Sequence, residues 1–371
     1  MKITKVVATC HSVPVMLPFQ DKPHPIEFFM VRVETDAGIV GHGIGPAYYR
    51  FSTREFIHRQ LGPFMIGKDP LATEMIWNRD APIELGSIHA SYFGSSEMLR
   101  WGFGAIDIAL WDIKGKYFNQ PIFRLLGGDT NRIPAYITAG LHTYSKDRLA
   151  EVANKMGRVE GNHLKMQVSY TNGPDMDEEE DRVRVMRQAM GDDVMLMVDA
   201  NDRLKLQQAK DLCSRIEKYD ITWFEAPISM TTSIEQLPLL RQYTTIPLGH
   251  SGSLPGQRWF YRNMIEAKAV DILQPNVVMV GGFTEAIKIA NLAQAFNLRV
   301  ATGAGQPAHN MHLIAGIANG WMVECHYGHV LRDQIIYKNA PHPERGWLTL
   351  PEKPGLGLDV DEAALKKYEE A

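Results

Sequence analysis

The chain has 371 residues, of which 45% are hydrophobic and 22% charged, so its composition is globular and excludes disorder as its main state. Its 39 Lys and Arg and 43 Asp and Glu residues give a net charge of −4, which excludes a general basic field for nucleic acid or a membrane surface. The apolar runs are far shorter than the roughly 20 residues of a membrane-spanning helix. The N-terminus reads as a strand rather than a signal peptide, and three scattered cysteines indicate reduced thiols in the cytoplasm.

The N-terminal part of the chain is predicted to begin as a small sheet. Strands are expected over residues 1–7, 28–35 and 39–43. The last two are separated by Asp36-Ala37-Gly38, a hairpin turn signal. Residues 20–26, rich in proline and charge, are expected to be a loop, and residues 52–130 to be mostly helical.

From about residue 133 the pattern changes to short apolar runs separated by helical stretches. The eight strand candidates are residues 133–139, 163–168, 194–199, 222–225, 246–250, 270–274, 298–302 and 321–324. Such alternation predicts a parallel sheet, and eight units match a closed (β/α)8 barrel better than an open sheet. The tail, residues 345–371, holds prolines and glycines before a short helix and is expected to be an extended return segment.

Three possible metal ligands stand at the carboxyl ends of successive strand candidates, where a barrel of this class has its active site. Asp199, Glu225 and His250 lie one βα unit apart, so we expect their side chains to converge. Carboxylates suit Mg²⁺ or Mn²⁺, and the imidazole shifts the preference toward Mn²⁺, Zn²⁺ or Fe²⁺. The sequence therefore predicts one divalent ion per chain on these three residues.

Several motifs resemble one known family across essentially the whole chain. The run AIDIALWDIKGK at 105–116, followed by QPIFRLLGG at 120–128, is similar to the signature of the enolase superfamily, in the mandelate racemase and muconate lactonizing enzyme branch. The segments VDAN at 198–201, WFEAP at 223–227 and PGLG at 354–357 resemble the same family, in the expected order.

The resemblance implies an α/β fold: a modified (β/α)7β barrel of the TIM type over residues 131–344, with an α+β capping domain of residues 1–130 plus 345–371. The cap and the tail are expected to pack at the carboxyl-terminal mouth of the barrel. The family removes the proton next to a substrate carboxylate and stabilises the resulting enediolate with a divalent ion, Mg²⁺ or Mn²⁺, and a lysine. A preorganised cation suits that task because the charge develops on carboxylate oxygens.

The residues at the family's catalytic positions are only partly the usual ones. Lys165 falls on the first lysine of a Lys-x-Lys motif, which contacts the substrate carboxylate, but the second lysine is Gln167, which cannot take a proton. The base of the opposite face is a histidine paired with an aspartate, and these positions read Gly303 and Asn276. Glu324 matches a family glutamate that hydrogen-bonds the substrate carboxylate.

The acid–base group is therefore open between two candidates. His326 points the same way as Glu324 if the strand continues. Lys165 is the other candidate, since a neighbouring dication is expected to lower its pKa and leave a neutral amine. His250 stands where the family usually has a third carboxylate, so the ion is expected to be a stronger electrophile but less tightly held, with water as the alternative ligand.

Substrate contacts are expected from two directions. Gln167, Asn201 and Asn276 lie at strand ends, while His24 and Arg50 reach down from the cap. The expected partner is a small carboxylate substrate, with no nucleic acid or membrane partner, and the chain is expected to form a homo-oligomer.

The expected reaction needs one base only. Two-base racemisation of the usual kind is disfavoured by Gln167 and Gly303, so the sequence favours an acid-sugar dehydratase. An epimerase, racemase or lactone cycloisomerase of the same superfamily is the alternative. A degenerate barrel that binds metal or ligand without turnover is a second one.

Overall fold

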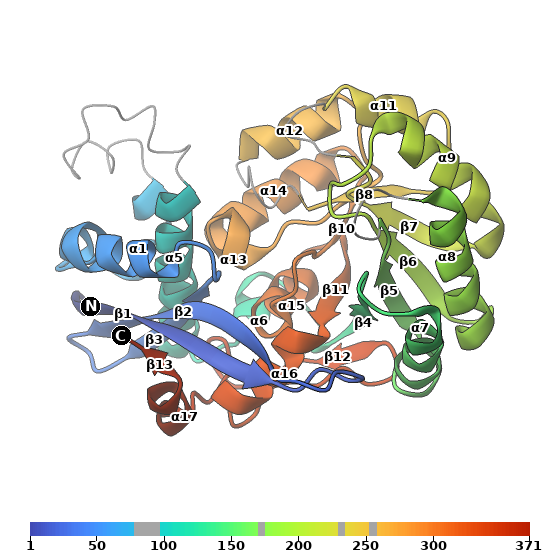
Figure 1. Cartoon of the computed structure of the whole chain (residues 1–371). Coiled ribbons are helices and arrows are strands. Elements are labelled where there is room, and N and C mark those ends of the chain that lie inside the picture. The colour runs from blue at the N-terminus through green and yellow to red at the C-terminus, as the bar shows by residue number, and fades with distance from the viewer. Residues whose placement is uncertain (78–96, 170–174, 229–233, 252–257) are drawn as a thin grey trace.

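The computed structural model describes residues 1–77, 97–169, 175–228, 234–251 and 258–371. These residues form an antiparallel sheet with helices on it and, beside it, a ring of parallel strands enclosed by helices (Figure 1). None of the helices within the described ranges is long and apolar enough to cross a membrane. Cys10, Cys213 and Cys325 are buried and unpaired, as expected for reduced thiols.

The antiparallel sheet has four strands in the order β13-β1-β2-β3. Its strands are β1 (Ile3–Val15), β2 (His24–Thr35), β3 (Val40–Gly45) and β13 (Glu369–Glu370). The turn between β2 and β3 lies where it is predicted, with Gly38 at a φ of 73°. Strands β1 and β2 are longer than expected because their ends, including Val13 and Phe28, are buried in the core that the sheet shares with the barrel. The loop between them therefore ends at His24, inside the stretch predicted as loop.

Short helices and one long helix cover the sheet. They are α1 (Arg50–Phe56), η1 (Ile57–Leu61), α2 (Gly62–Met65), η2 (Thr73–Trp77), α5 (Glu97–Tyr117) and α6 (Ile122–Leu125). Residues 78–96 of the stretch expected to be helical lie outside the described residues. Strand β3 packs so closely on α5 that a Cβ at Gly43 would lie 1.9 Å from the carbonyl oxygen of Ala105, so only glycine fits there.

Eight parallel strands close into a barrel. They are β4 (Arg132–Gly140), β5 (His163–Gln167), β6 (Met195–Asp199), β7 (Ile221–Glu225), β8 (Leu248–His250), β9 (Ile272–Leu273), β10 (Arg299–Ala301) and β11 (Gly320–His326). They pair in chain order, and β11 pairs with β4 to close the ring. All eight strand candidates coincide with these strands, and the α/β fold class with its barrel and cap is confirmed. Strand β11 continues to His326, so Glu324 and His326 share one side of it.

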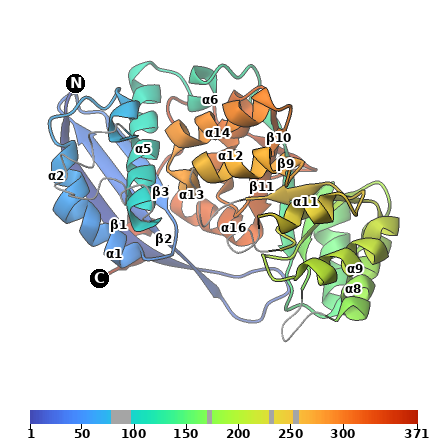
Figure 2. The ribbon, with the colours of Figure 1, turned by 90° about the horizontal axis from the view of Figure 1, so that it is seen from above.

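Helices follow the strands and form the outer ring. They are α7 (Lys146–Val152), η3 (Ala153–Val159), α8 (Met176–Met190), α9 (Leu206–Ile216), η4 (Glu217–Tyr219), α11 (Gln236–Arg241), α12 (Arg258–Glu266), α13 (Val277–Val280), α14 (Phe283–Ala295), α15 (Pro307–Gly316) and α16 (Tyr327–Ile336). The Asp175 carboxylate caps α8 by accepting the N–H groups of Asp177 and Glu178, so the acidic cluster there is a helix start. From above, α5 of the cap lies beside α13 of the ring (Figure 2).

The tail is divided between the two parts of the molecule. Strand β12 (Trp347–Thr349) pairs antiparallel with the first residues of β4, at the amino end of the barrel. Helix α17 (Glu362–Lys367) and β13 then reach the cap, where Glu370 pairs with Cys10. We expected the whole tail at the mouth, but β12 lies at the opposite end of the barrel. Residues 132–134 of β4 come before the part of the strand that pairs with β11, so their backbone groups need another partner, which β12 provides. The division into 1–130 plus 345–371 and 131–344 stays a prediction.

Candidate active site

Four of the expected side chains meet inside the carboxyl end of the barrel. The Nζ atom of Lys165 on β5 lies 2.5 Å from Oε2 of Glu225 on β7 and 2.8 Å from Oε1 of Glu324 on β11. It also lies 3.5 Å from Oδ2 of Asp199 on β6. Asp199 and Glu225 are direct neighbours in the strand register. The barrel closure thus brings together residues 159 positions apart in the chain, from 165 to 324.

This cluster carries more negative than positive charge. Lys165 is 1% exposed, and its single ammonium group faces three buried carboxylates. Burial disfavours the charged amine, but Glu225 and Glu324 outweigh burial and raise the pKa of Lys165 well above its usual range. We expected a dication to lower that pKa; the carboxylates seen around Lys165 act in the opposite direction. With all three carboxylates ionised, the cluster has an excess of two negative charges. Burial raises the pKa of Asp199 and brings that of Glu225 to about 7, although Lys165 acts in the opposite direction on both.

Polar neighbours fix each carboxylate in place. One oxygen of Asp199 accepts the backbone N–H of Asn201 at 2.8 Å. Glu225 accepts a hydrogen bond from the side-chain amide of Gln274 at 2.8 Å. Gln274 is not among the residues expected at the site; its signal is its place at the end of a strand candidate, directly before Pro275.

Glu324 is held from both sides. Its Oε1 accepts the hydroxyl of Thr138 on β4 at 2.6 Å, and its Oε2 accepts the backbone N–H of Gly305 at 2.6 Å. The pKa of Glu324 is lowered: burial acts to raise it, but the ammonium of Lys165 outweighs that effect. Glu324 is thus an ionised acceptor that steadies Lys165, and Thr138 is a second residue that the sequence did not reveal.

His250 is bonded to a residue outside the expected set of metal ligands. Its Nε2 is 2.9 Å from Oδ1 of Asp202, in the loop after β6. Among the residues that the structure describes, no three His, Cys, Asp or Glu side chains are placed as a ready metal cluster. Asp199 and Glu225 supply two oxygen donors side by side, which suits a hard divalent ion, and the role of His250 stays a prediction.

The expected substrate contacts fall into two groups. The Oε1 atom of Gln167 lies 2.8 Å from Nδ1 of His142, and Asn201 is exposed in the loop after β6. Asn276 is fully buried, and its amide bonds to backbone groups, including the carbonyl of Gly303 at 2.8 Å. These bonds give the side chain a place in the fold, and its contact with a substrate stays a prediction.

Arg50 and His24, the two contacts expected from the cap, differ in where they lie. The guanidinium of Arg50 forms ion pairs with Glu27 at 2.9 Å and with Glu370 at 3.0 Å, so it ties strands of the cap together instead of reaching the barrel. His24, at the start of β2, lies close enough to His326 to oppose protonation of that ring. The structure thus brings His24, but not Arg50, toward the cluster.

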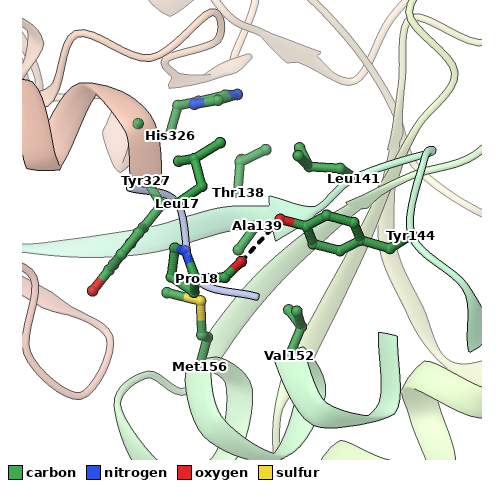
Figure 3. Close-up of a pocket in the computed structure, with 11 residues that line it drawn as sticks. Leu17, Pro18, Thr138, Ala139, Leu141, Tyr144, Val152, Met156, His326 and Tyr327 are labelled. Atoms are coloured by element: carbon green, nitrogen blue, oxygen red, sulfur yellow. Dashed lines mark hydrogen bonds between the residues drawn. The ribbon is translucent and has the colours of Figure 1, made fainter. Parts of the chain in front are cut away.

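His326 lines a pocket between the cap and the barrel (Figure 3). The lining residues are Leu17, Pro18, Thr138, Ala139, Leu141, Tyr144, Val152, Met156, His326, Tyr327 and Gly328. The Tyr144 hydroxyl donates to the carbonyl of Pro18 at 3.1 Å, which ties the loop between β1 and β2 to the barrel. Burial lowers the pKa of His326, so its imidazole stays neutral down to a lower pH than an ordinary histidine does.

Comparisons with known proteins identify a family over most of the chain. The family described as "Mandelate racemase / muconate lactonizing enzyme, N-terminal domain" matches residues 2–127, and "Enolase C-terminal domain-like" matches residues 147–364. Arabinonate dehydratase of Saccharolobus solfataricus is 30% identical over 356 residues, covering 93% of this chain and 91% of its own length.

Two solved structures are similar over their whole length. The 3,6-anhydro-D-galactonate cycloisomerase from Zobellia galactanivorans has a TM-score of 0.84 and 31% identity, covering all of both chains. The L-talarate dehydratase from Polaromonas sp. JS666, complexed with Mg and L-glucarate, has a TM-score of 0.85 and 25% identity, covering 100% of this chain and 98% of its own.

Proposed function

Because the chain belongs to the mandelate racemase and muconate lactonizing enzyme branch of the enolase superfamily, we propose that it is an acid-sugar dehydratase. It would remove the proton alpha to the carboxylate of a hydroxy acid and eliminate the hydroxyl group at the next carbon. The observation that carries the proposal is the contact of Lys165 with Asp199, Glu225 and Glu324 inside the barrel. Two of the similar proteins are dehydratases of such acids.

The donor set fits one divalent ion per chain, Mg²⁺ or Mn²⁺. Asp199 and Glu225 would hold it, and the two negative charges that Lys165 leaves unbalanced are the charge that such an ion neutralises. His250 is the proposed third ligand, which requires it to exchange its bond with Asp202 for the metal. A bound ion supplies a positive charge for the oxygens of the substrate carboxylate as the enediolate forms.

The structure favours His326 over Lys165 as the base. Three carboxylates hold Lys165 as an ammonium group, which suits a cation that stabilises the enediolate. His326 lies on the same side of β11 as Glu324, and its buried Nδ1 has no hydrogen bond to a described residue. Glu324 would hold Lys165 against the substrate carboxylate.

The proton balance of the proposed reaction needs this one base. The imidazole lone pair of His326 takes the α-proton, and the C–H electron pair moves into the enediolate. The imidazolium then gives the same proton to the leaving β-hydroxyl, the C–O bond breaks, and water departs. The enol that remains converts to a 2-keto acid. Gln167, Asn201 and His24 are the proposed contacts to the sugar hydroxyls.

A lactone cycloisomerase is the second candidate, since the Zobellia cycloisomerase is 31% identical across the whole chain. Two-base racemisation is disfavoured by the turn at Gly303. A Cβ there would lie 2.9 Å from Oε1 of Glu225 and 3.0 Å from Cβ of Ser251, which leaves little room for a base. We further propose a cytoplasmic homo-oligomer whose partner is a small carboxylate.

The test is proton exchange in deuterated buffer. The full chain with Mg²⁺ or Mn²⁺ is incubated with both enantiomers of arabinonate, D-galactonate, L-glucarate, D-galactarolactone and 3,6-anhydro-D-galactonate, and the α-proton is followed by NMR. Loss of the α-proton with formation of a 2-keto acid is expected for at least one acid, and removal of the metal by EDTA should stop it. An isomer formed without loss of water would indicate the cycloisomerase. No exchange with any acid by metal-loaded protein would contradict both and favour the non-catalytic barrel.

A further inference from the structure

A second histidine lies against His326. His329 is in the first turn of α16, and the centres of the two imidazole rings are 5.2 Å apart. Given the proposed function, on which this inference rests, we propose that His329 is a positioning residue for His326, and that the two rings replace the absent histidine–aspartate pair. One proton is carried at a time, on His326, while His329 stays neutral.

One hydrogen bond fixes the state of His329. Its Nδ1 lies 3.1 Å from the backbone nitrogen of Gln306. A backbone N–H can only donate, so Nδ1 is the acceptor and the proton of the neutral ring is on Nε2. His329 is thus held in one tautomer and one orientation beside the ring that we propose as the base.

The donor of that bond belongs to a strained turn. Ala304, Gly305 and Gln306 have φ values of 59°, 71° and 63°, the left-handed region that costs free energy for residues other than glycine. The turn presents two successive N–H groups to the site: Gly305 donates to Glu324, and Gln306 donates to His329. It therefore positions both residues at once.

Buried side chains hold this turn in place. The amide of Asn276 donates to the carbonyls of Gly303 at 2.8 Å and Gly305 at 3.1 Å. Asn310 donates to the carbonyl of Gly305 at 2.8 Å. The family has an aspartate at this position, which pairs with an imidazole and cannot donate to carbonyls. The asparagine of this chain can donate, and it therefore suits a turn that presents backbone carbonyls in place of the imidazole.

The surrounding charges keep the second proton away. Burial lowers the pKa of His329 well below its usual value, and the nearby guanidinium of Arg332 acts in the same direction. Arg332 is itself buried and paired with Asp333. The ionisable groups that face His326 are Glu324 on its own strand, Lys165 on β5, His24 on β2 and His329 on α16. Of these, only Glu324 favours a proton on His326.

Gly305 gives a direct test of the contact. A Cβ at this position would lie 2.1 Å from Nδ1 of His329 and 3.0 Å from Cβ of His326. Gly305→Ala should therefore displace His329. Gly38→Ala is the matched control, because Gly38 has a similar φ of 73° but no atom within 4 Å of a Cβ. Both variants carry similar backbone strain, and only the first disturbs the histidine pair.

The main experiment is His329→Asn, which keeps a short acceptor for Gln306 and removes the ring. Nitrogen NMR of the imidazoles in the full chain is recorded from pH 5 to 9, together with the kcat and KM of α-proton exchange. In the parent protein, His329 should stay in the Nε2–H form and His326 should titrate alone. In His329→Asn and Gly305→Ala, the titration of His326 should change, because its ring loses the neighbour that packs against it. We expect kcat to fall roughly tenfold to hundredfold, the range for a metal-bound histidine that loses its orienting partner, with KM nearly unchanged.

The outcomes separate this inference from the proposed function. The proposed pair would be overturned if the His329 ring took up a proton at a higher pH than His326. It would also be overturned if His329→Asn left both the titration of His326 and kcat unchanged. Normal NMR behaviour of the pair without exchange of any acid would leave the pair standing and contradict the dehydratase. A fall in kcat in Gly38→Ala equal to that in Gly305→Ala would show that turn strain, and not the imidazole contact, matters, and would also overturn it.

Discussion

Lys165 is the residue on which most of the cluster depends, because its ammonium group separates three carboxylates that would otherwise face one another. Lys165→Met removes the charge but keeps an unbranched side chain. We expect turnover of the acid found in the exchange screen to fall by at least about 100-fold, the range for a group that acts directly on the reacting centre. Activity and metal content of the folded variant are the measurements.

The control for this substitution is Lys338→Met, at an exposed lysine. It should keep the activity of the parent protein. If Lys165→Met folds, binds one divalent ion and turns over at a normal rate, the assignment of Lys165 is wrong and the charge on the enediolate must be stabilised by another group.

The sequence predicts individual residues well where their position in a strand determines what they do. Lys165, Asp199, Glu225 and Glu324 end strands of one barrel, so the topology that joins the strands also joins the side chains. It does not reveal Gln274, Thr138 or Gln306, because their roles depend on single hydrogen bonds between distant segments. The bond from His250 to Asp202 is hidden for the same reason, since it depends on a left-handed loop residue.

At the scale of elements, the turn after β10 decides what the barrel can carry at its mouth. Asn276→Asp restores the residue that the family has but replaces two donated hydrogen bonds with repulsion between a carboxylate and two carbonyls. We expect a loss of about 1–3 kcal/mol in the free energy of unfolding, the cost of leaving buried polar groups unsatisfied. Urea unfolding measures it.

An exposed asparagine provides the comparison for that substitution. Asn297 has a φ of 57°, which aspartate tolerates, and Asn297→Asp should change stability by less than about 0.5 kcal/mol. A neutral Asn276→Asp variant would show that the amide does not hold the turn through its donated bonds.

Element boundaries follow from the sequence less closely than element order does. The eight barrel strands are all predicted, but β9 has only two residues where five were expected, 270–274. Backbone bonds from Asp271 to Leu248 and from Gln274 to His250 continue the pairing with β8 on either side of it. Strands β1 and β2 extend beyond the predicted alternation because alternate residues at their barrel ends, such as Val13, Val15 and Ile26, are buried in the core shared with the barrel.

For the molecule as a whole, the family signature serves mainly to join the cap to the barrel. Asp107 on α5 accepts the backbone N–H of Thr284 on α14 at 3.0 Å, and the indole of Trp111 donates to the hydroxyl of the same threonine at 2.9 Å. Asp112 accepts the N–H of His42 in the cap sheet and the N–H of Leu356 in the tail. These contacts explain why a helix remote from the reacting groups carries the most recognisable run of the sequence.

This junction predicts a pH dependence of stability. Burial raises the pKa of Asp107 to about 7, although hydrogen bonds from Thr284 act in the opposite direction. An ordinary aspartate in the unfolded chain titrates near about 4. Between these values the folded protein holds a proton that the unfolded chain releases. The stabilisation is therefore fully present below about pH 4 and is lost as pH rises to about 7.

Asp107→Asn should remove this dependence, because an amide does not titrate and its oxygen can still accept from Thr284. Urea unfolding of both proteins from pH 4 to 8 gives the difference between their free energies of unfolding at each pH. The other titrating groups are the same in both proteins, so their contributions cancel in this difference. Relative to Asp107→Asn, the parent protein should lose stability steadily over this range, by no more than about 4 kcal/mol at about 1.4 kcal/mol per pKa unit. An exposed carboxyl changed in the same way, Asp193→Asn, should keep the parent slope. Parallel curves for the parent and Asp107→Asn would mean that Asp107 is ionised throughout and that the cap is joined to the barrel by a charge-assisted bond.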